Sequence, residues 1–593
     1  MVLHTRLFPS ASLRFLNDLS WALIHPCYWL LDHLVASFLT TTQEQRQCTQ
    51  DPCASLTPCV LLVTPLYLLL AVVWLPVALL GFLVWAPLQA VRRPYAYGHR
   101  RTGRAEKGWG EWKAPGRRSF GFASANVCLL PDSLARFNNL ADTQGRACEL
   151  GRRIFCGVSR PRIRIYVDSP TSSSVCTTSS QTFSLDNKPD VNGREDELEG
   201  QQTPPDCPLQ SAGVQISISD PGSAPKGVNS VPCDEGVFDS CVTPQESLTG
   251  LHRGNKDKSN GSPSDHAPEL KKCARPRKRS VGDGLDHEVS AFFPANLDFL
   301  CLQEVFDRQA AVKLKQQLHH YFPFILSDVG RYAWKGCCSQ FKFLNSGLML
   351  ASQYPILDAD YHCFPNGRGE DALAAKGVLF AKVQVGKSSQ GKSIVGYIAC
   401  THLHSIEGDS VVRCEQLNML LEYGAYFRKA TKRQKDQVAF EVLLGDLNFD
   451  NCSSEDKLEQ QHILFSHYKD PCRVGPGEDQ PWALGTLLEI NGLYDEEVCT
   501  PERMQKVMEN EEGRNEYLAY PPGKKHCFDQ EGQAIPLKGN GRRIDYILYS
   551  EEGLQQDWKV GVEEYSFITQ LAGLTDHLAV AMRLAVSMGE EEL

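Results

Sequence analysis

The sequence lacks several features that would place it in a well-known class of protein. It has no excess of basic residues: 61 Lys and Arg stand against 71 Asp and Glu, which gives a net charge of −10 and argues against a protein that coats nucleic acid. The 22 cysteines in 593 residues are too dilute for a small disulfide scaffold, and no CxxC pair of the zinc-binding kind occurs. No serine or cysteine elbow offers a nucleophile for acyl transfer, and we expect no nucleotide-binding P-loop.

Charged residues are also absent from one long stretch, Pro52–Val91. A run of this length and apolarity is typical of a membrane segment, and we predict its apolar part at residues 60–88. Pro65, Pro76 and Pro87 divide it into pieces of about ten residues, each able to cross about half of the hydrocarbon layer as a helix. The segment therefore suits either a re-entrant hairpin around Pro76 or one kinked span.

A weaker apolar stretch, Ser20–Leu39, contains Pro26 and Asp32. It suits a shallow or re-entrant membrane element, with a buried amphipathic helix as the alternative. Asp18 precedes it and no small-residue cleavage site follows closely, which argues against a cleaved signal peptide. We expect residues 1–91, with hydrophobic segments at about 20–39 and 60–88, to form an α-helical membrane-associated domain.

A basic stretch follows the apolar run. Residues 92–118 contain nine Lys or Arg and two Glu, and we interpret them as a juxtamembrane linker on the cytosolic side. The cluster either contacts anionic phospholipids such as phosphatidylserine, at about 1 kcal/mol per basic residue, or is a solvated linker. Three cysteines flank the apolar run and are either sites of S-acylation or inert thiols: Cys48, Cys53 and Cys59.

Residues 169–284 are dominated by Ser, Pro, Asp, Gly, Gln and Lys, without apolar periodicity. Such a segment cannot bury enough surface to offset the entropy of ordering, so we predict a disordered insertion. Just before it, Pro161–Tyr166 alternates with period two, which predicts a short strand. The same residues resemble the PxIxIT docking peptide of the phosphatase calcineurin. Residues 589–593 form an acidic tail.

Seven strand-like apolar runs in the remaining chain contain polar residues of catalytic type, mostly where the run ends. They carry Asn126, Glu304, Asn345, His402, Asp446 with Asn448, Asp545, and Asp576 with His577. Strand ends hold polar groups at fixed positions, as a preorganised site requires. Carboxylate and amide oxygens suit Mg²⁺, or Mn²⁺, rather than zinc, and histidines serve as acid, base or stabiliser of phosphate charge. This combination favours metal-assisted attack of water on a phosphoester.

These runs also carry a family resemblance. The ordered motifs ANVCLL, CLQEVF, LNSGL, ACTHLH, GDLNFD, RRIDYIL and LTDHLAV resemble those of the endonuclease/exonuclease/phosphatase superfamily, which has the deoxyribonuclease I-like fold. Within it, the chain is similar to the neutral sphingomyelinases. The resemblance implies an α+β catalytic domain, a four-layer α/β/β/α sandwich split between 119–168 and 285–588. It implies a phospholipase C-type phosphodiesterase that hydrolyses sphingomyelin to ceramide and phosphocholine.

The same resemblance implies where such a protein works and what its first site residues do. The location is the cytosolic face of Golgi and plasma membranes, with no nucleic-acid partner. Glu304 would bind Mg²⁺, and Asn126 would lie beside the metal and the phosphate. Asp446 and Asn448 would orient or activate water and hold a phosphate oxygen.

Four further residues receive roles by resemblance. His577 would be the general base, and Asp545 the carboxylate that fixes its tautomer. Asp576 would lie near metal or water, and His402 would stabilise the developing phosphorane charge. Which aspartate takes the water proton stays open at this point.

Three residues have candidate substrate-binding or regulatory roles: Asn345, Asp371 and Lys376. Lys376 either reaches phosphate, pairs with Asp371 in an inactive state, or forms a plain surface pair. Cys337 and Cys338 are candidates for acylation. A choline headgroup favours an aromatic face, and the candidates for it are Tyr332, Trp334 and Tyr361.

Other functions remain as alternatives. Inositol-phospholipid 5-phosphatases of this fold usually carry Gly-Asp-x-Asn-x-Arg, but Asp450 stands in place of that Arg. A nuclease has no use for a bilayer anchor and would need a different net charge. A catalytically inactive membrane scaffold would not need all of these polar positions filled. The sequon at Asn451 lies beside Asp446, where a glycan would crowd the site, which again favours the cytosolic face.

Overall fold

The computed structural model describes residues 3–50, 56–101, 110–113, 115–160, 163–167, 214–218, 285–333, 341–521, 527–528, 534–535 and 540–589. Most of the predicted insertion 169–284 and of the acidic tail lies outside these residues, as do Cys337, Cys338, Trp334 and the side chains of Cys53 and Cys59. Strand β4 (Ile163–Val167), which covers most of the predicted strand at 161–166, pairs antiparallel with β5 (Val214–Ile218).

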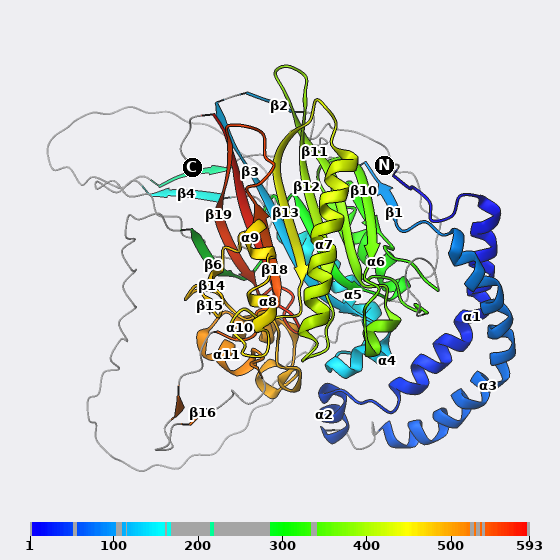
Figure 1. Ribbon diagram of the computed structural model, residues 1–593. Helices are drawn as coiled ribbons and strands as arrows, with labels where there is room; N and C mark the ends of the chain where they lie inside the picture. Colours follow the sequence, from blue (N-terminus) through cyan, green and yellow to red (C-terminus); the bar gives the residue numbers. More distant parts are fainter. Residues whose placement is uncertain are drawn as a thin grey trace, which may run out of the picture. The chain divides into compact units, whose positions relative to one another are not determined.

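The amino-terminal residues form three helices, α1 (Ala11–Ala36), α2 (Thr42–Gln50) and α3 (Leu56–Leu88). Helices α1 and α3 run alongside one another (Figure 1), and the indole Nε1 of Trp74 donates to Leu23 O at 3.1 Å. A Cβ atom on Gly81 would lie 2.8 Å from Ser20 O, so only glycine allows the two backbones to approach this closely.

Of the two alternatives for the second apolar segment, a hairpin around Pro76 or one span, the structure has a single continuous helix. Pro65, Pro76 and Pro87 all lie inside α3, which continues through them for 33 residues, about 50 Å at 1.5 Å per residue. Each proline removes one backbone hydrogen bond but does not end the helix here. The portion Val63–Val91 is long and apolar enough to cross a membrane. A hairpin turning at Pro76 is therefore excluded.

Two large β-sheets form the centre of the remaining described residues. In one, the order is β1 (Ala96–His99), β8 (Phe324–Ser327), β9 (Met349–Ser352), β7 (Phe299–Val305), β3 (Gly116–Leu129), β20 (Ala579–Met588), β19 (Trp558–Ile568) and β6 (Asp286–Ser290). In the other, it is β10 (Ile356–Cys363), β11 (Gly377–Ser388), β12 (Ser393–His402), β13 (Gln437–Asp446) and β18 (Asp545–Ser550), with β2 (Glu111–Trp112) paired to β11.

The sheets pack face to face and helices cover their outer faces. The core between them includes Phe122 of β3 and Phe440 of β13, whose ring centroids lie 5.2 Å apart. Helices α5 (Thr143–Val158) and α6 (Arg308–Leu318) pack on the outer face of the first sheet, and α7 (Ser410–Thr431) packs on that of the second. This is the predicted four-layer α/β/β/α sandwich (Figure 1).

Shorter elements fill the connections. They are α4 (Asp132–Ala135), η3 (Arg136–Asn138), α8 (Lys457–Gln460), α9 (Leu464–His467), α10 (Pro501–Met508), α11 (Glu511–Tyr517), and the hairpins β14 (Arg473–Gly475) with β15 (Glu478–Asp479) and β16 (Cys527–Phe528) with β17 (Ala534–Ile535). A fourth apolar cluster joins Met504 and Met508 of α10 to Cys128 and Leu578, the latter beside His577.

The segment 92–118, predicted as a linker, contributes strands to both sheets. β1 pairs with β8 of the first sheet, and β2 pairs with β11 of the second. The guanidinium of Arg92 is buried and donates to Gly330 O at 2.7 Å and to Asp328 Oδ1 at 2.8 Å. Arg92 therefore anchors this segment to the catalytic domain instead of facing lipid, and the domain begins earlier than residue 119.

One hairpin carries the G-x-x-x-x-G-K-S spacing of a P-loop, at Gly386–Ser393, contrary to the expectation that no such spacing occurs. A P-loop leads from a strand into a helix. Here the residues connect β11 to its antiparallel neighbour β12, and the turn is closed by Gly391 N, which donates to Ser388 O at 2.8 Å. The match is therefore one of spacing only.

Candidate active site

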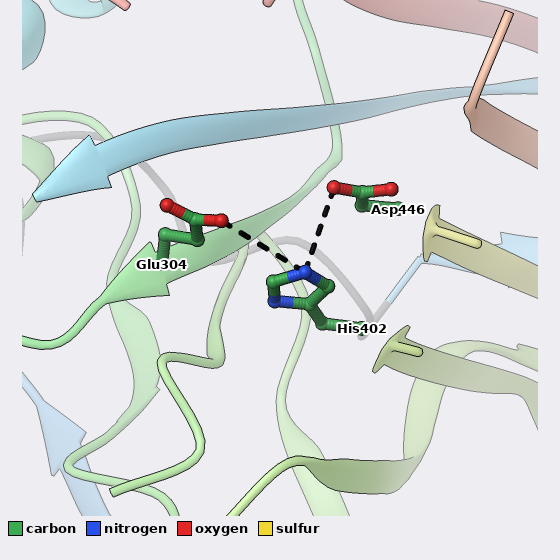
Figure 2. A group of neighbouring side chains, drawn as sticks. All are labelled: Glu304, His402 and Asp446. Atoms are coloured by element: carbon green, nitrogen blue, oxygen red, sulfur yellow. Dashed lines mark ion pairs between the residues drawn. The ribbon is translucent and has the colours of Figure 1, made fainter. Parts of the chain in front are cut away.

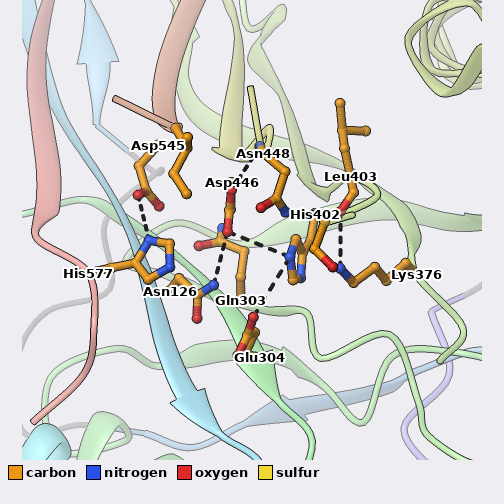
Figure 3. A network of polar contacts seen from close by, with 12 residues as sticks. Asn126, Gln303, Glu304, Lys376, His402, Leu403, Asp446, Asn448, Asp545 and His577 are labelled. Atoms are coloured by element: carbon orange, nitrogen blue, oxygen red, sulfur yellow. Dashed lines mark hydrogen bonds and ion pairs between the residues drawn. The ribbon is translucent and has the colours of Figure 1, made fainter. Parts of the chain in front are cut away.

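The strand register brings the predicted residues to one edge of the sandwich. β3 and β7 pair in parallel, with Asn126 opposite Gln303 and thus next to Glu304. β12 and β13 are also parallel, with His402 opposite Asp446. Asp446 in turn lies opposite Asp545 of antiparallel β18. Because these positions share one end of the strands, polar groups from both sheets meet there (Figure 3).

Asn126 joins the two sheets. Its Nδ2 donates to Asp446 Oδ2 at 3.0 Å, and its main-chain O accepts from Thr575 Oγ1 at 2.9 Å. The other Asp446 oxygen, Oδ1, accepts from the main-chain N of Asn448 at 2.9 Å. Asn126 and Asp446 are both buried, so these bonds fix their positions.

Glu304, Asp446 and His402 form a compact group (Figure 2). His402 Nε2 lies 3.9 Å from Glu304 Oε1 and 3.6 Å from Asp446 Oδ2, and one ligand atom of each residue lies within 4.8 Å of the others. Among the described residues, Glu304 Oε2 and both ring nitrogens of His402 are buried without a hydrogen-bond partner. Two carboxylates and an imidazole with unused acceptor atoms are a donor set that fits a hard divalent cation.

Burial and like charge raise the pKa of both carboxyl groups. For Glu304 burial is the larger cause, and repulsion from Asp576 adds to it. For Asp446 burial, with repulsion from Asp545, raises the pKa to about 7. Burial, reinforced by Lys376, lowers the pKa of His402 well below its ordinary value, so this imidazole is neutral. A bound cation would offset the repulsion between the carboxylates.

The backbone of Glu304 is held in an uncommon conformation, with φ at 59°. A Cβ atom on Gly347 would lie 3.0 Å from Glu304 N and Cα, and Gly347 O accepts from Val305 N at 2.8 Å. Asn345, predicted to bind substrate or regulate, directs its Oδ1 to Gly347 N at 2.9 Å. Its position therefore supports the loop that backs Glu304.

His577 and Asp545 form the predicted dyad, with Nδ1 and Oδ2 at 2.8 Å (Figure 3). Burial alone would lower the pKa of His577, but the charge and hydrogen bond of Asp545, with smaller contributions from Asp576 and Asp446, raise it well above its ordinary value. The hydroxyl of Thr486 accepts from the main-chain N of Asp545 at 3.1 Å. Thr486 belongs to no recognisable motif, so its role could not be predicted from local sequence.

Asp576 is buried beside this dyad, and its Oδ1 accepts from Thr575 Oγ1 at 3.2 Å. Its charge reaches both Glu304 and His577, since it contributes to the raised pKa of each group. This agrees with a place near the metal or water.

Lys376 and Asp371 form a buried pair, so the alternative of a plain surface pair is wrong. Lys376 Nζ lies 2.8 Å from Asp371 Oδ1 and donates to Leu403 O at 3.1 Å. Asn448 Nδ2 donates to the same Leu403 oxygen at 3.1 Å. The loop after β12 thus joins Lys376 to the site, and Lys376 is close enough to oppose the rise in the pKa of Glu304.

His404, two residues after His402, has no predicted role but forms two contacts with carboxylates near the site. Its Nδ1 lies 3.0 Å from Asp371 Oδ2 and its Nε2 lies 2.9 Å from Asp409 Oδ2. Ser405 donates from its main-chain N to Asp371 Oδ2 at 2.6 Å. The His-x-His spacing at the end of β12 is the sequence signal that could have pointed to this residue.

Comparison with known proteins agrees with this geometry. Residues 12–91 match the model of the neutral sphingomyelinase N-terminal transmembrane region, and residues 275–577 match the endonuclease/exonuclease/phosphatase family. Sphingomyelin phosphodiesterase 3 of Rattus norvegicus is 51% identical over 100% of both chains. Sphingomyelin phosphodiesterase 5 of Mus musculus is 34% identical over 98% of this chain and 93% of its own.

The chain belongs to the neutral sphingomyelinase family. Among solved structures, a beta toxin from Staphylococcus aureus with bound magnesium ions is 18% identical, covers 49% of this chain and 86% of its own, and has a TM-score of 0.31. The protein named SmcL is 17% identical with a TM-score of 0.30, over 49% of this chain and 86% of its own.

Not every predicted residue of this family member reaches the site. Tyr361, a candidate for a choline contact, lies in β10 instead of a loop, is buried, and donates its hydroxyl to Ala375 O. It therefore has no face to offer a ligand. The ring of Tyr332 lies against Trp85, with centroids 5.7 Å apart, and under the guanidinium of Arg92 at 4.8 Å.

Proposed function

We propose that this sphingomyelinase family member hydrolyses sphingomyelin to ceramide and phosphocholine with Mg²⁺ as its cation, at the cytosolic face of a membrane. The observation that carries the proposal is the group of Glu304, Asp446 and His402 beside the His577–Asp545 dyad at the junction of the two sheets. The names of the full-length relatives supply the substrate class.

Glu304 and Asp446 are the residues that would hold the cation, because Asp446 is a buried carboxylate and Glu304, whose side chain is 17% exposed, has its Oε2 buried without a hydrogen-bond partner within the described part of the chain. When bound, Mg²⁺ would neutralise charge on the phosphate and on the leaving oxygen. Mn²⁺ has similar ligand preferences and is expected to substitute for it.

His577 is the proposed general base. Asp545 holds the Nδ1 proton, and a bound cation would offset the charges of Asp576 and Asp446 that help to raise the pKa of His577, so that Nε2 could accept a proton from the attacking water. The negative charge of Asp545 would then stabilise the imidazolium that results. His402 is neutral, and its ring is placed to donate a hydrogen bond to a developing phosphorane oxygen. Asn126 positions Asp446 through its Nδ2.

The test is release of phosphocholine from sphingomyelin vesicles. We expect release to require Mg²⁺, to stop when the cation is chelated, and to fall by about 10²- to 10⁴-fold in His577→Ala. Parallel assays on inositol phospholipids and on DNA should be negative. Turnover of either one at a rate matching or exceeding that of sphingomyelin would favour the 5-phosphatase or nuclease alternative instead.

Lys376 is proposed to exchange partners. In the described arrangement it pairs with Asp371, and release from that pair would allow Nζ to reach a substrate phosphate. Lys376→Ala should then lose turnover and its response to anionic lipid such as phosphatidylserine. Full turnover with full lipid activation in this variant would contradict the exchange.

The cytosolic location is supported by Asn451. This residue is buried, and its Nδ2 donates to Gly475 O at 3.0 Å and to Asp479 Oδ1 at 2.7 Å, so a glycan on that nitrogen would have no room. Golgi and plasma membranes are the proposed sites of residence. Recovery of a glycosylated peptide containing Asn451 would place the domain on the other side of the membrane.

Two further attachments are proposed from the sequence. Palmitate on Cys53, Cys59, Cys337 and Cys338 should give hydroxylamine-sensitive labelling that is lost when all four are replaced by Ser.

Calcineurin should bind through Pro161–Tyr166, and Ile163→Ala with Ile165→Ala should abolish capture by purified calcineurin. Capture unchanged by this double substitution would contradict the docking site.

A further inference from the structure

A short helical segment next to the site is joined to the membrane region. Helix α4 and the following η3 turn, Asp132–Asn138, begin three residues after β3 ends at Leu129. Asn126, which contacts Asp446, lies near the same end of β3. We refer to residues 132–139, which follow the strand end that carries Asn126, as the rim segment.

Three polar contacts tie this rim segment to α1, α2 and the turn between them. Asp32 Oδ1 accepts from the main-chain N of Ser133 at 3.0 Å and from its hydroxyl at 2.5 Å. Thr42 N donates to Asn139 Oδ1 at 2.8 Å, and Asn139 Nδ2 donates to Thr42 Oγ1 at 2.9 Å.

The third contact is an ion pair. Arg136 binds both oxygens of Glu44, at 2.5 and 2.7 Å, and also donates to Leu39 O at 2.7 Å. Burial alone would raise the pKa of Glu44, but the hydrogen bond from Arg136 lowers it below its ordinary value. Both side chains therefore stay charged, and their charges offset each other. Arg136 is therefore occupied by a protein partner, and the polar groups in these contacts face α1, α2 and the turn between them.

The apolar side chains of the same segment face outward. Phe137 is 62% exposed and Leu134 is 39% exposed. On α1 and just after it, Val35 is 43% exposed and Phe38 is 66% exposed. Val35 and Phe38 lie in sequence between Asp32 and Leu39, the two residues of this stretch that hold Ser133 and Arg136, and these contacts bring the two exposed apolar pairs to the same junction.

We propose that Leu134 and Phe137 insert into the bilayer beside Val35 and Phe38, as a second membrane contact formed by the catalytic domain itself. We call these four residues the rim patch. Lipid is the occupant because the patch continues the apolar surface of a region that belongs to the family's transmembrane domain, and because its only basic side chain, Arg136, is already paired. The consequence is that the Asn126 end of β3 is held at the lipid surface. Insertion of the rim patch into lipid does not depend on the proposed hydrolysis of sphingomyelin. Only the purpose of that insertion, which is to hold the site at the lipid surface, rests on the proposed function.

The direct test is photo-crosslinking of the full chain in phosphatidylcholine vesicles. Benzoylphenylalanine at position 137, and separately at 134, should form adducts with lipid that mass spectrometry detects. The matched control is position 426. Tyr426 is 58% exposed on α7 near the end that leads into β13, whereas Asp446 lies at the opposite end of β13. No lipid adduct is expected there.

Adducts at 137 and 134 only with protein, whether a second copy or another chain, would overturn the rim patch, and so would equal lipid labelling at 426. Because crosslinking needs no turnover, this result is independent of whether the protein hydrolyses sphingomyelin.

A second measurement is hydrolysis in vesicles. Phe137→Asp should lower the rate by about tenfold. Moving a phenylalanine side chain from water into lipid contributes at least the free energy that corresponds to a tenfold change in binding. Phe137→Leu should retain most of the rate, and Tyr426→Asp all of it. A Phe137→Asp protein that is folded and as active as the unaltered chain would contradict the proposal.

Discussion

Two buried clusters of acidic residues in this protein are built in opposite ways. Around Arg543, the guanidinium Nε lies 2.7 Å from Asp479 Oδ2 and Nη2 lies 2.9 Å from Asp470 Oδ2, so a permanent cation of the protein pairs with both carboxylates. Around Glu304 and Asp446, the basic side chain in contact with both is His402, at 3.9 and 3.6 Å, and its lowered pKa leaves it uncharged.

The difference shows which buried carboxylates of the protein can serve to bind an external cation. A buried carboxylate without a cationic partner is costly, so it persists where an external cation uses it. The Arg543 cluster, by contrast, contains its own cation and holds the loop 470–480 against the residues that lead into β18. Three measurements separate the cluster that contains its own cation from the cluster that requires a bound one. A fourth compares them with an exposed ion pair.

The largest effect is expected from Arg543→Met. It leaves Asp470 and Asp479 buried without their partner, and breaking such a pair typically costs about 3–5 kcal/mol of unfolding free energy. The loss should be the same with and without Mg²⁺, as measured by thermal unfolding in detergent. A loss confined to one of the two conditions would show that this cluster is not self-contained.

Binding of the cation itself should stabilise the other cluster. At a concentration one hundred times the dissociation constant, Mg²⁺ should add about 2.7 kcal/mol to the unfolding free energy. The effect should vanish in Glu304→Gln and persist in Arg543→Met. An undiminished shift in Glu304→Gln would remove this residue from the cation site.

Without cation, the stability should depend on pH through Asp446. Its pKa rises from 3.8 in the unfolded chain to about 7 in the folded protein. The folded state therefore holds a proton that the unfolded chain releases, and stability should fall as pH rises from about 4 to about 7, by at most about 1.4 kcal/mol per unit. Asp446→Asn should flatten this slope; an unchanged slope would assign it to other groups.

The smallest effect is expected at an exposed pair. Arg117 lies 2.9 Å from Glu563, with their side chains 41% and 23% exposed. Arg117→Met should change the unfolding free energy by no more than about 1 kcal/mol, and less at high salt. A loss comparable to that of Arg543→Met would mean that exposure does not separate the two kinds of pair.

The site could be predicted largely from the sequence, because its polar residues follow strand-like runs and strand ends meet at an edge. Glu304, Asp446, His402 and the His577–Asp545 dyad all converge as expected. Residues that act through tertiary contact alone carry no local signal. Thr486, which fixes the backbone of Asp545, stands in no motif.

The fold was predictable at the level of layers but less so in its boundaries. Proline spacing left open whether the second apolar segment forms a hairpin or one span. In the structure, α3 packs against α1 and continues as one helix through all three prolines. The strands β1 and β2 have four and two residues, too short for a period-two pattern to show within a basic segment. Tertiary pairing, which local composition does not report, decides both cases.

The place of β3 in the first sheet has a consequence for how the polypeptide can be divided. β3 lies between β7 and β20, yet it precedes the long insertion while both neighbours follow it. A protease cut between Val167 and Leu285 would therefore release no fragment of the sandwich, since its two pieces remain joined by a central strand and by the Asn126–Asp446 bond. The same two pieces, expressed separately, offer a natural pair for complementation, in which restored catalysis reports that the halves have met.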